Sequence, residues 1–108
     1  MTPRLPYPLE DYFKDANARD VATMLSRFTN DSIVVDEGRR HRGLVEIHEW
    51  MRQTIEEYAF QVDPIESSQR GSDTLVTTSV SGRFPGSPIT LQYAFRVENR
   101  KITALEIG

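Results

Sequence analysis

Carboxylate and phenol side chains, such as those of Asp36, Tyr12 and Tyr93, are of types that can take part in moving a proton on a small molecule. A carboxylate in a partly apolar pocket can act as a general base, because desolvation raises its pKa toward the working range. A phenol hydroxyl can donate a hydrogen bond to an oxygen on which negative charge develops. Asp36 and Tyr12 also have ordinary structural interpretations. Asp36 can open the turn into Glu37-Gly38, and Tyr12 can be a core residue.

The two histidines, His41 and His48, lie near Asp36 and Glu37 in the sequence, and these residue types are common metal ligands. Their spacing matches no standard ligand pattern, so no metal site is predicted. His41 belongs to a basic run, Arg39-Arg40-His41-Arg42, which is typical of a solvated loop. Alternatively, the same run could attract a carboxylated ligand to the mouth of a cavity.

Composition excludes several other functions. The 108 residues include no cysteine, which excludes disulfides, thiolate catalysis and zinc–thiolate sites. No serine lies in a nucleophile-elbow context and no glycine-rich phosphate loop is present, so no cofactor is predicted. The net charge of −3 argues against nucleic acid as a partner. No apolar run reaches the roughly 20 residues of a membrane span, and Met1 to Pro8 lack a signal-peptide stretch, so a cytoplasmic location is expected.

Hydrophobic spacing predicts the elements that must position these residues. Apolar residues at helical spacing predict a first helix just after Pro8 and a second helix, capped by Asp20, that includes Phe28. Thr29-Asn30-Asp31 is typical of a turn, and Ser32 to Asp36 is typical of a short strand rich in β-branched residues.

A polar stretch from Glu37 to Gly43 is predicted to be a loop, and a third helix is predicted from Leu44 to Tyr58. The hydrophobic period then changes from 3.6 to 2, which predicts strands over residues 60–65, 73–82, 89–97 and 102–107. Strict alternation predicts that one set of side chains faces the helices: Ile89, Leu91, Tyr93, Phe95 and Val97. Short turns between the strands predict antiparallel pairing within one α+β domain spanning residues 1–108.

Four segments along nearly the whole chain carry a family resemblance. They are Tyr12-Phe13-x-x-x-Asn17-Ala18-x-Asp20, Phe28-x-x-Asp31-x-x-Val34-x-Asp36, Gly43-x-x-x-Ile47 and Gly82-x-Phe84-Pro85-Gly86-Ser87-Pro88. In this order and spacing they resemble the nuclear transport factor 2-like superfamily, specifically its SnoaL-like and ketosteroid-isomerase-like branch. The resemblance implies a cone-shaped α+β fold, with three N-terminal helices packed on a curved antiparallel sheet and an apolar cavity at one end.

The resemblance also implies roles for single residues. Asp36 takes the position of the isomerase carboxylate that moves a proton beside a carbonyl, and Tyr12 that of the phenol that donates to the oxyanion. The second donor of those isomerases, a protonated carboxylic acid, falls on or near Tyr93 here. This departure means that the resemblance does not extend to steroid isomerisation itself, although two phenols can also form a donor pair. The ligand-binding wall is expected to contain Trp50, Phe60, Phe84, Leu91 and Phe95.

Two functions of different class fit these observations. The first is a cofactor-independent acid–base enzyme of isomerase, cyclase or dehydratase type, in which Asp36 takes a proton from a small apolar carbonyl compound. The second is a non-catalytic dimeric module that binds a small apolar ligand or another protein. The resemblance predicts a homodimer through the outer face of the sheet. Small or uncharged residues such as Thr77 and Gln92 on that face support the prediction.

Overall fold

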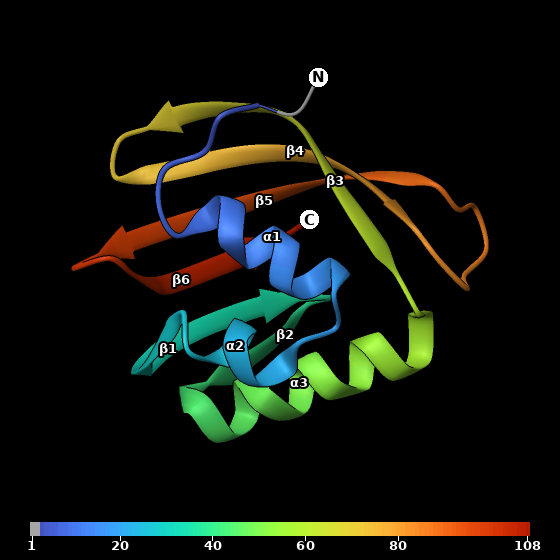
Figure 1. Ribbon diagram of the computed structural model, residues 1–108, viewed down its shortest axis with the longest axis horizontal. Helices are drawn as coiled ribbons and strands as arrows, with labels where there is room; N and C mark the ends of the chain where they lie inside the picture. The colour runs from blue at the N-terminus through green and yellow to red at the C-terminus, as the bar shows by residue number, and fades with distance from the viewer. Residues whose placement is uncertain (1–2) are drawn as a thin grey trace.

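Three helices and six strands make up most of residues 3–108, the part of the chain that the computed structural model describes. The helices are α1 (Leu9–Asn17), α2 (Val21–Leu25) and α3 (Gly43–Tyr58). The strands are β1 (Phe28–Asp36), β2 (Arg39–Arg42), β3 (Gln61–Arg70), β4 (Asp73–Ser81), β5 (Ile89–Glu98) and β6 (Lys101–Ile107). All six strands form one sheet in the order β2-β1-β6-β5-β4-β3. Figure 1 shows α1 in front of this curved sheet and α3 along its β1–β2 end.

The sheet is mixed because its first long strand pairs with its last. β1 runs parallel to β6, whereas the other neighbouring strands are antiparallel. The prediction of a wholly antiparallel sheet was therefore wrong for this pair. That prediction followed from short turns between consecutive strands, but β1 and β6 are far apart in the chain. A parallel pair needs such a long connection.

The second helix is shorter than predicted, because α2 ends before Phe28 and this residue begins β1. Phe28 pairs with Ile102 of β6, and its ring packs edge-on against Tyr12 with 5.8 Å between the ring centroids. The turn predicted at residues 29–31 is instead an irregular part of β1, where the pairing register with β6 shifts. Both differences arise from contacts with a strand about 70 residues away, which local patterns do not report.

Two further stretches belong to the sheet rather than to loops. The predicted loop at residues 37–43 contains β2, which pairs with β1 through a tight turn at Glu37 and Gly38. These turn residues have φ of 54° and 73°, as a two-residue hairpin turn requires. β3 continues past Pro64 to Arg70 because it is an edge strand and its register shifts just after the proline. A proline is tolerated at such positions.

Aromatic side chains form the core between the helices and the sheet. As predicted, Tyr93 and Phe95 of β5 face the helices, and both are buried. The Phe95 ring lies 5.6 Å from that of Tyr12 and 5.7 Å from that of Phe13 on α1. These edge-on contacts hold α1 against the middle of the sheet.

The amide of Asn17 fastens the end of α1 to the edge strand β3. Its Nδ2 donates to the carbonyl oxygen of Val62 at 2.8 Å, and its Oδ1 accepts from the Val62 N–H at 2.8 Å. The side chain therefore pairs with β3 much as the backbone of a neighbouring strand would. This contact fixes α1, which carries Tyr12, relative to the far edge of the sheet.

A buried serine holds the irregular part of β1 against β6. The Ser32 hydroxyl donates to the carbonyl oxygen of Ile102 at 2.6 Å, and its oxygen accepts from the N–H of Thr29 at 2.8 Å. Ser32 is fully buried, so no water could replace a lost hydroxyl without a rearrangement. The hydroxyl thus satisfies backbone groups that the register shift would otherwise leave unpaired.

Ser32→Ala is expected to lower the free energy of unfolding by about 1–3 kcal/mol, the typical cost of leaving a buried polar group unsatisfied. Ser68→Ala is the matched control, because Ser68 is exposed on β3, and its effect should stay within about 0.5 kcal/mol. Urea unfolding followed by circular dichroism measures both. Equal, small effects would show that this hydroxyl does not hold β1 to β6.

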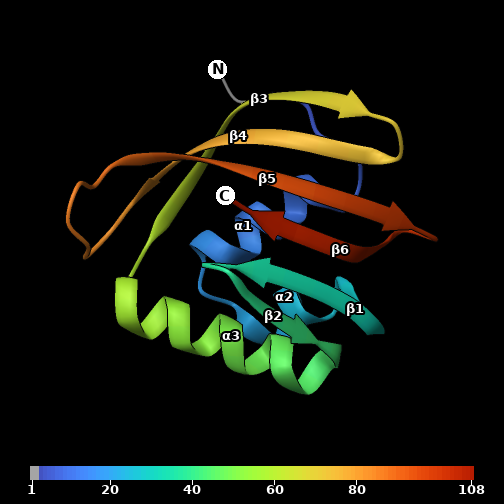
Figure 2. The same cartoon turned by 180° about the vertical axis from the view of Figure 1, so that it is seen from behind.

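Figure 2 shows the outer face of β4, β5 and β6, over which no helix of the described chain lies. A depression on this face is lined by small or apolar residues, including Ile33, Val35, Ala94 and Ala104, and also by the charged residues Asp73, Arg96 and Glu106. Within residues 3–108, no helix combines the length and the apolar character needed to cross a membrane.

A homodimer through this outer face stays a prediction. Sedimentation velocity at tens of micromolar is expected to give twice the mass of one chain. Ala94→Arg should shift the mass toward that of the single chain, because Ala94 lies in the depression and a bulky charge there would oppose close packing. A single-chain mass for the unsubstituted protein at this concentration would contradict the prediction.

Candidate functional site

A cavity of about 430 Å³ lies between the helices and the inner face of the sheet. Its wall is mostly apolar or aromatic and includes residues from α1, α3, β1, β4, β5 and β6. Exposed wall residues such as Glu37, Pro85 and Ile89 mark the end that is open to solvent. The hairpin turn after β1 and the β4–β5 connection therefore form part of its mouth.

Seven of the eight residues predicted for the site line this cavity. They are Tyr12, Asp36, Trp50, Phe60, Phe84, Leu91 and Tyr93. The eighth, Phe95, is fully buried among other aromatic rings and is not part of the wall. The rings of Tyr12, Phe13 and Tyr93 surround it at centroid distances of 5.6, 5.7 and 5.8 Å. Phe95 therefore supports the wall from behind.

The register of the strands brings Asp36 and Tyr93 into one row across the sheet. Asp36 pairs with Ile107 on β6, and Ile107 pairs with Tyr93 on β5. The two side chains therefore stand on the same face, two strand spacings or roughly 10 Å apart at the backbone. All three residues of this row line the cavity.

Tyr12 reaches the same cavity from α1. Its ring is fixed by edge-on contacts with Phe13, Phe28 and Phe95, at centroid distances of 5.5, 5.8 and 5.6 Å. Ala16, one helical turn further on, also lines the cavity. The apolar stripe that predicted this helix thus also presents the phenol to the cavity.

The hydroxyls of Tyr12 and Tyr93 are available to a ligand. Within residues 3–108, neither hydroxyl has a hydrogen-bond partner in the protein, although the residues are only 3% and 6% exposed. No fully buried side-chain polar atom of this part of the chain lacks a partner, so both hydroxyls must reach the cavity space. Burial raises the pKa of both phenols, and the nearby charge of Asp36 raises the pKa further. Both groups are therefore protonated donors at neutral pH.

The carboxylate of Asp36 ends β1 at the cavity wall and is held by a tryptophan. Nε1 of Trp50 donates to Oδ2 of Asp36 at 2.9 Å. Burial raises the pKa of Asp36 above its ordinary value, the hydrogen bond from Trp50 opposes this shift, and the charge of Glu37 adds to it. The net effect is a carboxylate that takes up a proton more readily than an exposed aspartate does.

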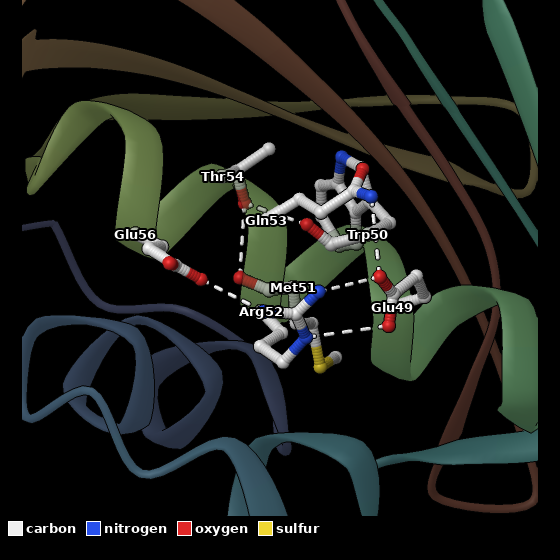
Figure 3. A network of polar contacts seen from close by, with 7 residues as sticks. All are labelled: Glu49, Trp50, Met51, Arg52, Gln53, Thr54 and Glu56. Carbon is white, nitrogen blue, oxygen red and sulfur yellow. Dashed lines mark hydrogen bonds and ion pairs between the residues drawn. The ribbon is translucent and has the colours of Figure 1, made fainter.

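The other polar side chains of the wall are already paired. The Tyr58 hydroxyl donates to Oε1 of Glu37 at 2.9 Å, and this bond raises the pKa of Tyr58 to about 12. The Thr54 hydroxyl lies within 2.9 Å of the carbonyl oxygen of Trp50 and 3.2 Å of that of Met51, both on its own helix (Figure 3). Sequence reasoning missed Glu37, Thr54 and Tyr58 as wall residues. Trp50, Thr54 and Tyr58 recur every fourth residue, a spacing that places them on one helix face.

The exposed side of α3 carries ion pairs that do not take part in the cavity. Arg52 lies between Glu49 and Glu56, with N–O distances of 2.6 and 2.7 Å (Figure 3). Gln53 also donates to Glu49 at 3.1 Å. Because these side chains are largely solvated, the pairs add little to stability.

The histidines and the basic run lie outside the cavity wall. The His41 ring is half-buried, 6.1 Å from that of Trp50, and His48 is exposed on α3. Arg39, Arg40 and Arg42 are exposed and do not line the cavity, so the structure does not support an anion-attracting mouth built from this run. Among residues 3–108, no group of three or more His, Cys, Asp or Glu side chains is placed to hold a metal ion.

The family comparison agrees with this geometry. The SnoaL-like domain matches residues 9–105, nearly the whole chain. The protein belongs to the SnoaL-like domain family. This membership, together with solved structures of ketosteroid isomerase-like and SnoaL-like fold, confirms the predicted resemblance to the nuclear transport factor 2-like superfamily. No curated protein matches the sequence.

Several solved structures are similar to this SnoaL-like chain. A candidate polyketide cyclase from Sinorhizobium meliloti is 38% identical over 96% of this chain and 95% of its own, with a TM-score of 0.93. A protein of ketosteroid isomerase-like fold from Catenulispora acidiphila, in complex with trimethylamine, is 16% identical over 95% and 86%, with a TM-score of 0.80. SalBIII, an epoxide hydrolase/cyclase-like enzyme with a role in forming the pyran ring of salinomycin, is 18% identical over 92% and 84%, with a TM-score of 0.80. The last two share the fold alone.

Asp36→Asn is expected to stabilise this SnoaL-like domain more at neutral pH than in acid. Burial raises the pKa of Asp36 in the folded chain above its unfolded value of about 3.9. As pH rises between these two values, the unfolded state loses its proton first, so the Asp36 contribution to stability falls. It stays low above the folded-state pKa. Asparagine cannot ionise, so the substituted chain avoids this fall in stability. The amide oxygen of the asparagine can still accept the hydrogen bond from Trp50.

Urea unfolding at a series of pH values measures this difference. Asp63→Asn is the control, because it removes an aspartate that is exposed on β3 and should not reproduce the divergence. A stability difference between Asp36→Asn and the unsubstituted chain that does not change with pH would contradict the assignment of a desolvated carboxylate.

Proposed function

We propose that this SnoaL-like protein is a cofactor-independent acid–base enzyme that moves a proton beside the carbonyl group of a small apolar molecule. One observation carries the proposal. A desolvated carboxylate, Asp36, shares an apolar cavity with two buried phenols, Tyr12 and Tyr93, whose hydroxyls have no protein partner within residues 3–108. A proton acceptor and two oxyanion donors in one mostly apolar site are the groups that enolisation needs.

In the proposed reaction, Asp36 removes a proton from the carbon next to the carbonyl. The electron pair of that C–H bond forms a C=C bond, and the carbonyl oxygen becomes an enolate oxygen. Tyr12 and Tyr93 donate hydrogen bonds to this oxygen and strengthen them as its charge grows. Where the enolate is conjugated with a further C=C bond, Asp36 returns the proton to the far carbon of that bond and an isomer forms. Where the enolate carbon attacks a second carbonyl of the same molecule, a new C–C bond closes a ring, the π bond of that carbonyl breaks, and its oxygen takes the proton back from Asp36.

The comparisons support this reaction class without naming a substrate. The similar protein from Sinorhizobium meliloti is a candidate polyketide cyclase, and SalBIII acts in ring formation. For the present chain, the expected ligand is a small apolar carbonyl compound, because about 430 Å³ of mostly apolar space surrounds the three polar groups.

The hydrogen bond from Trp50 favours a second candidate, a non-catalytic binding module. This bond stabilises the ionised form of Asp36 and so weakens it as a base. Asp36 could then serve only to orient Trp50 in the wall of a ligand cavity. Proton transfer to solvent separates the two candidates, because a binding module would not accelerate it.

Deuterium exchange into small cyclic ketones in D₂O, followed by NMR, tests the proposal without a known substrate. The protein is expected to accelerate exchange at the carbon next to the carbonyl. Asp36→Asn should abolish the acceleration, and Tyr12→Phe or Tyr93→Phe should reduce it by roughly a hundredfold, the typical effect of losing one oxyanion donor. Glu66→Gln is the control, because Glu66 is exposed on β3 and outside the cavity wall.

A thermal-shift measurement with the same ketones reports binding separately, since a ligand of the native state raises the melting temperature. Asp36→Asn should keep this shift while losing exchange. Ketones that raise the melting temperature but exchange no faster than with Asp36→Asn would instead establish the binding module.

A further inference from the structure

The cavity wall is rich in aromatic rings and acidic groups. Six aromatic residues line it: Tyr12, Trp50, Tyr58, Phe60, Phe84 and Tyr93. The charged side chains of the wall are both acidic, Asp36 and Glu37, and no Lys, Arg or His of residues 3–108 lies in it. An anionic ligand would therefore enter without a counter-charge, whereas a cationic ligand would meet two.

The mouth of the cavity combines an acidic group with two perpendicular aromatic rings. The rings of Tyr58 and Phe84 have centroids 5.9 Å apart and an interplanar angle of 89°, so their faces point in two directions. The Tyr58 hydroxyl donates to Glu37 at 2.9 Å, which places the carboxylate at the edge of this corner. Aromatic faces attract ammonium and quaternary ammonium groups, and a nearby carboxylate adds to that attraction.

The position of this corner is fixed by the backbone. Gly82 passes so close to the end of α3 that a Cβ there would lie 2.6 Å from the carbonyl oxygen of Tyr58. The same carbonyl accepts a hydrogen bond from the N–H of Arg83 at 2.7 Å. Phe84 is thereby held beside Tyr58, while the turn after β1 brings Glu37 to the Tyr58 hydroxyl.

The two ends of the cavity differ in chemistry. The mouth offers Glu37 with two aromatic faces, and the interior offers the unpaired hydroxyls of Tyr12 and Tyr93. Asp36, which also lines the cavity, is next to Glu37 in the chain. The charge of Glu37 raises the pKa of Asp36, so the two carboxylates repel each other, and a bound cation would reduce this repulsion.

We propose that the otherwise apolar ligand of this cavity carries at one end a positively charged amine or quaternary ammonium group, which binds at the mouth among Glu37, Tyr58 and Phe84. In a carbonyl substrate, the carbonyl oxygen would then lie at the Tyr12 and Tyr93 end. The placement of the carbonyl oxygen rests on the proposed function, whereas the cation site does not.

Three probes of nearly equal size and different charge test the cation site by isothermal titration calorimetry. They are choline, its neutral carbon analogue neohexyl alcohol, and the carboxylate of tert-butylacetic acid. Choline is expected to bind about tenfold more tightly than the alcohol, within the range of a desolvated cation–aromatic contact, and the carboxylate should bind most weakly. None of the probes has a ketone group, so failure of the exchange experiment leaves this test unaffected.

Glu37→Gln removes the charge and keeps an oxygen that can accept from Tyr58. It is expected to bring the affinities of choline and the alcohol within about twofold of each other, mainly by weakening choline. Glu57→Gln is the matched control, because it removes an equal charge from an exposed residue beside Tyr58 that lies outside the wall. It should leave the preference for choline nearly unchanged.

Phe84→Leu tests the aromatic contribution and should weaken choline several-fold more than the alcohol. Three results would overturn the proposal: no choline binding to the unsubstituted protein, equal binding of choline and the alcohol, or equal losses in Glu37→Gln and Glu57→Gln. Melting temperatures of the variants show whether each is folded, and Glu37→Gln alone suffices if Phe84→Leu is not.

Discussion

The parallel pairing of β1 with β6 is the constraint on which the site depends. It places Asp36, Ile107 and Tyr93 in one row across three strands. A shift of β1 by one residue would turn Asp36 to the outer face, because side chains alternate along a strand. The Ser32 hydroxyl opposes such a shift, since it spans the irregular part of β1 and reaches the carbonyl of Ile102. A hydrogen bond outside the cavity wall therefore helps to decide which groups face the cavity.

The polar groups of the cavity are arranged so that few remain without a partner. Trp50 donates to Asp36, Tyr58 donates to Glu37, and the Thr54 hydroxyl bonds to its own helix. Only the two buried phenols among the described wall side chains keep free donors. Donors fixed in place before a ligand arrives need little reorganisation when charge develops on an oxygen. The edge-on contacts around Tyr12 and the Asn17–Val62 pair provide that fixation.

The spacing of apolar residues predicted those helices and strand faces that depend on neighbouring residues in the sequence. Helical spacing located α1 and α3, and alternation along β5 placed Tyr93 on the inner face. Alternation could not show how deep each inner residue lies, so it did not separate Tyr93 at the cavity from Phe95 behind it. Phe28 looked helical because its partner, Ile102, is distant in the sequence. The catalytic roles proposed for Asp36, Tyr12 and Tyr93 came from the family resemblance, because no local signal joins α1, β1 and β5 in one site.

The two edges of the sheet carry features that discourage association with other chains. β2, at one edge, consists of the basic run Arg39-Arg40-His41-Arg42, whose arginines are exposed. β3, at the other edge, contains Pro64 and a register shift. Charged side chains, prolines and bulges on edge strands hinder the addition of a further strand and so limit aggregation. The basic run, which does not contact the cavity, thus keeps the hairpin that carries Asp36 and Glu37 from becoming a template for β-aggregation.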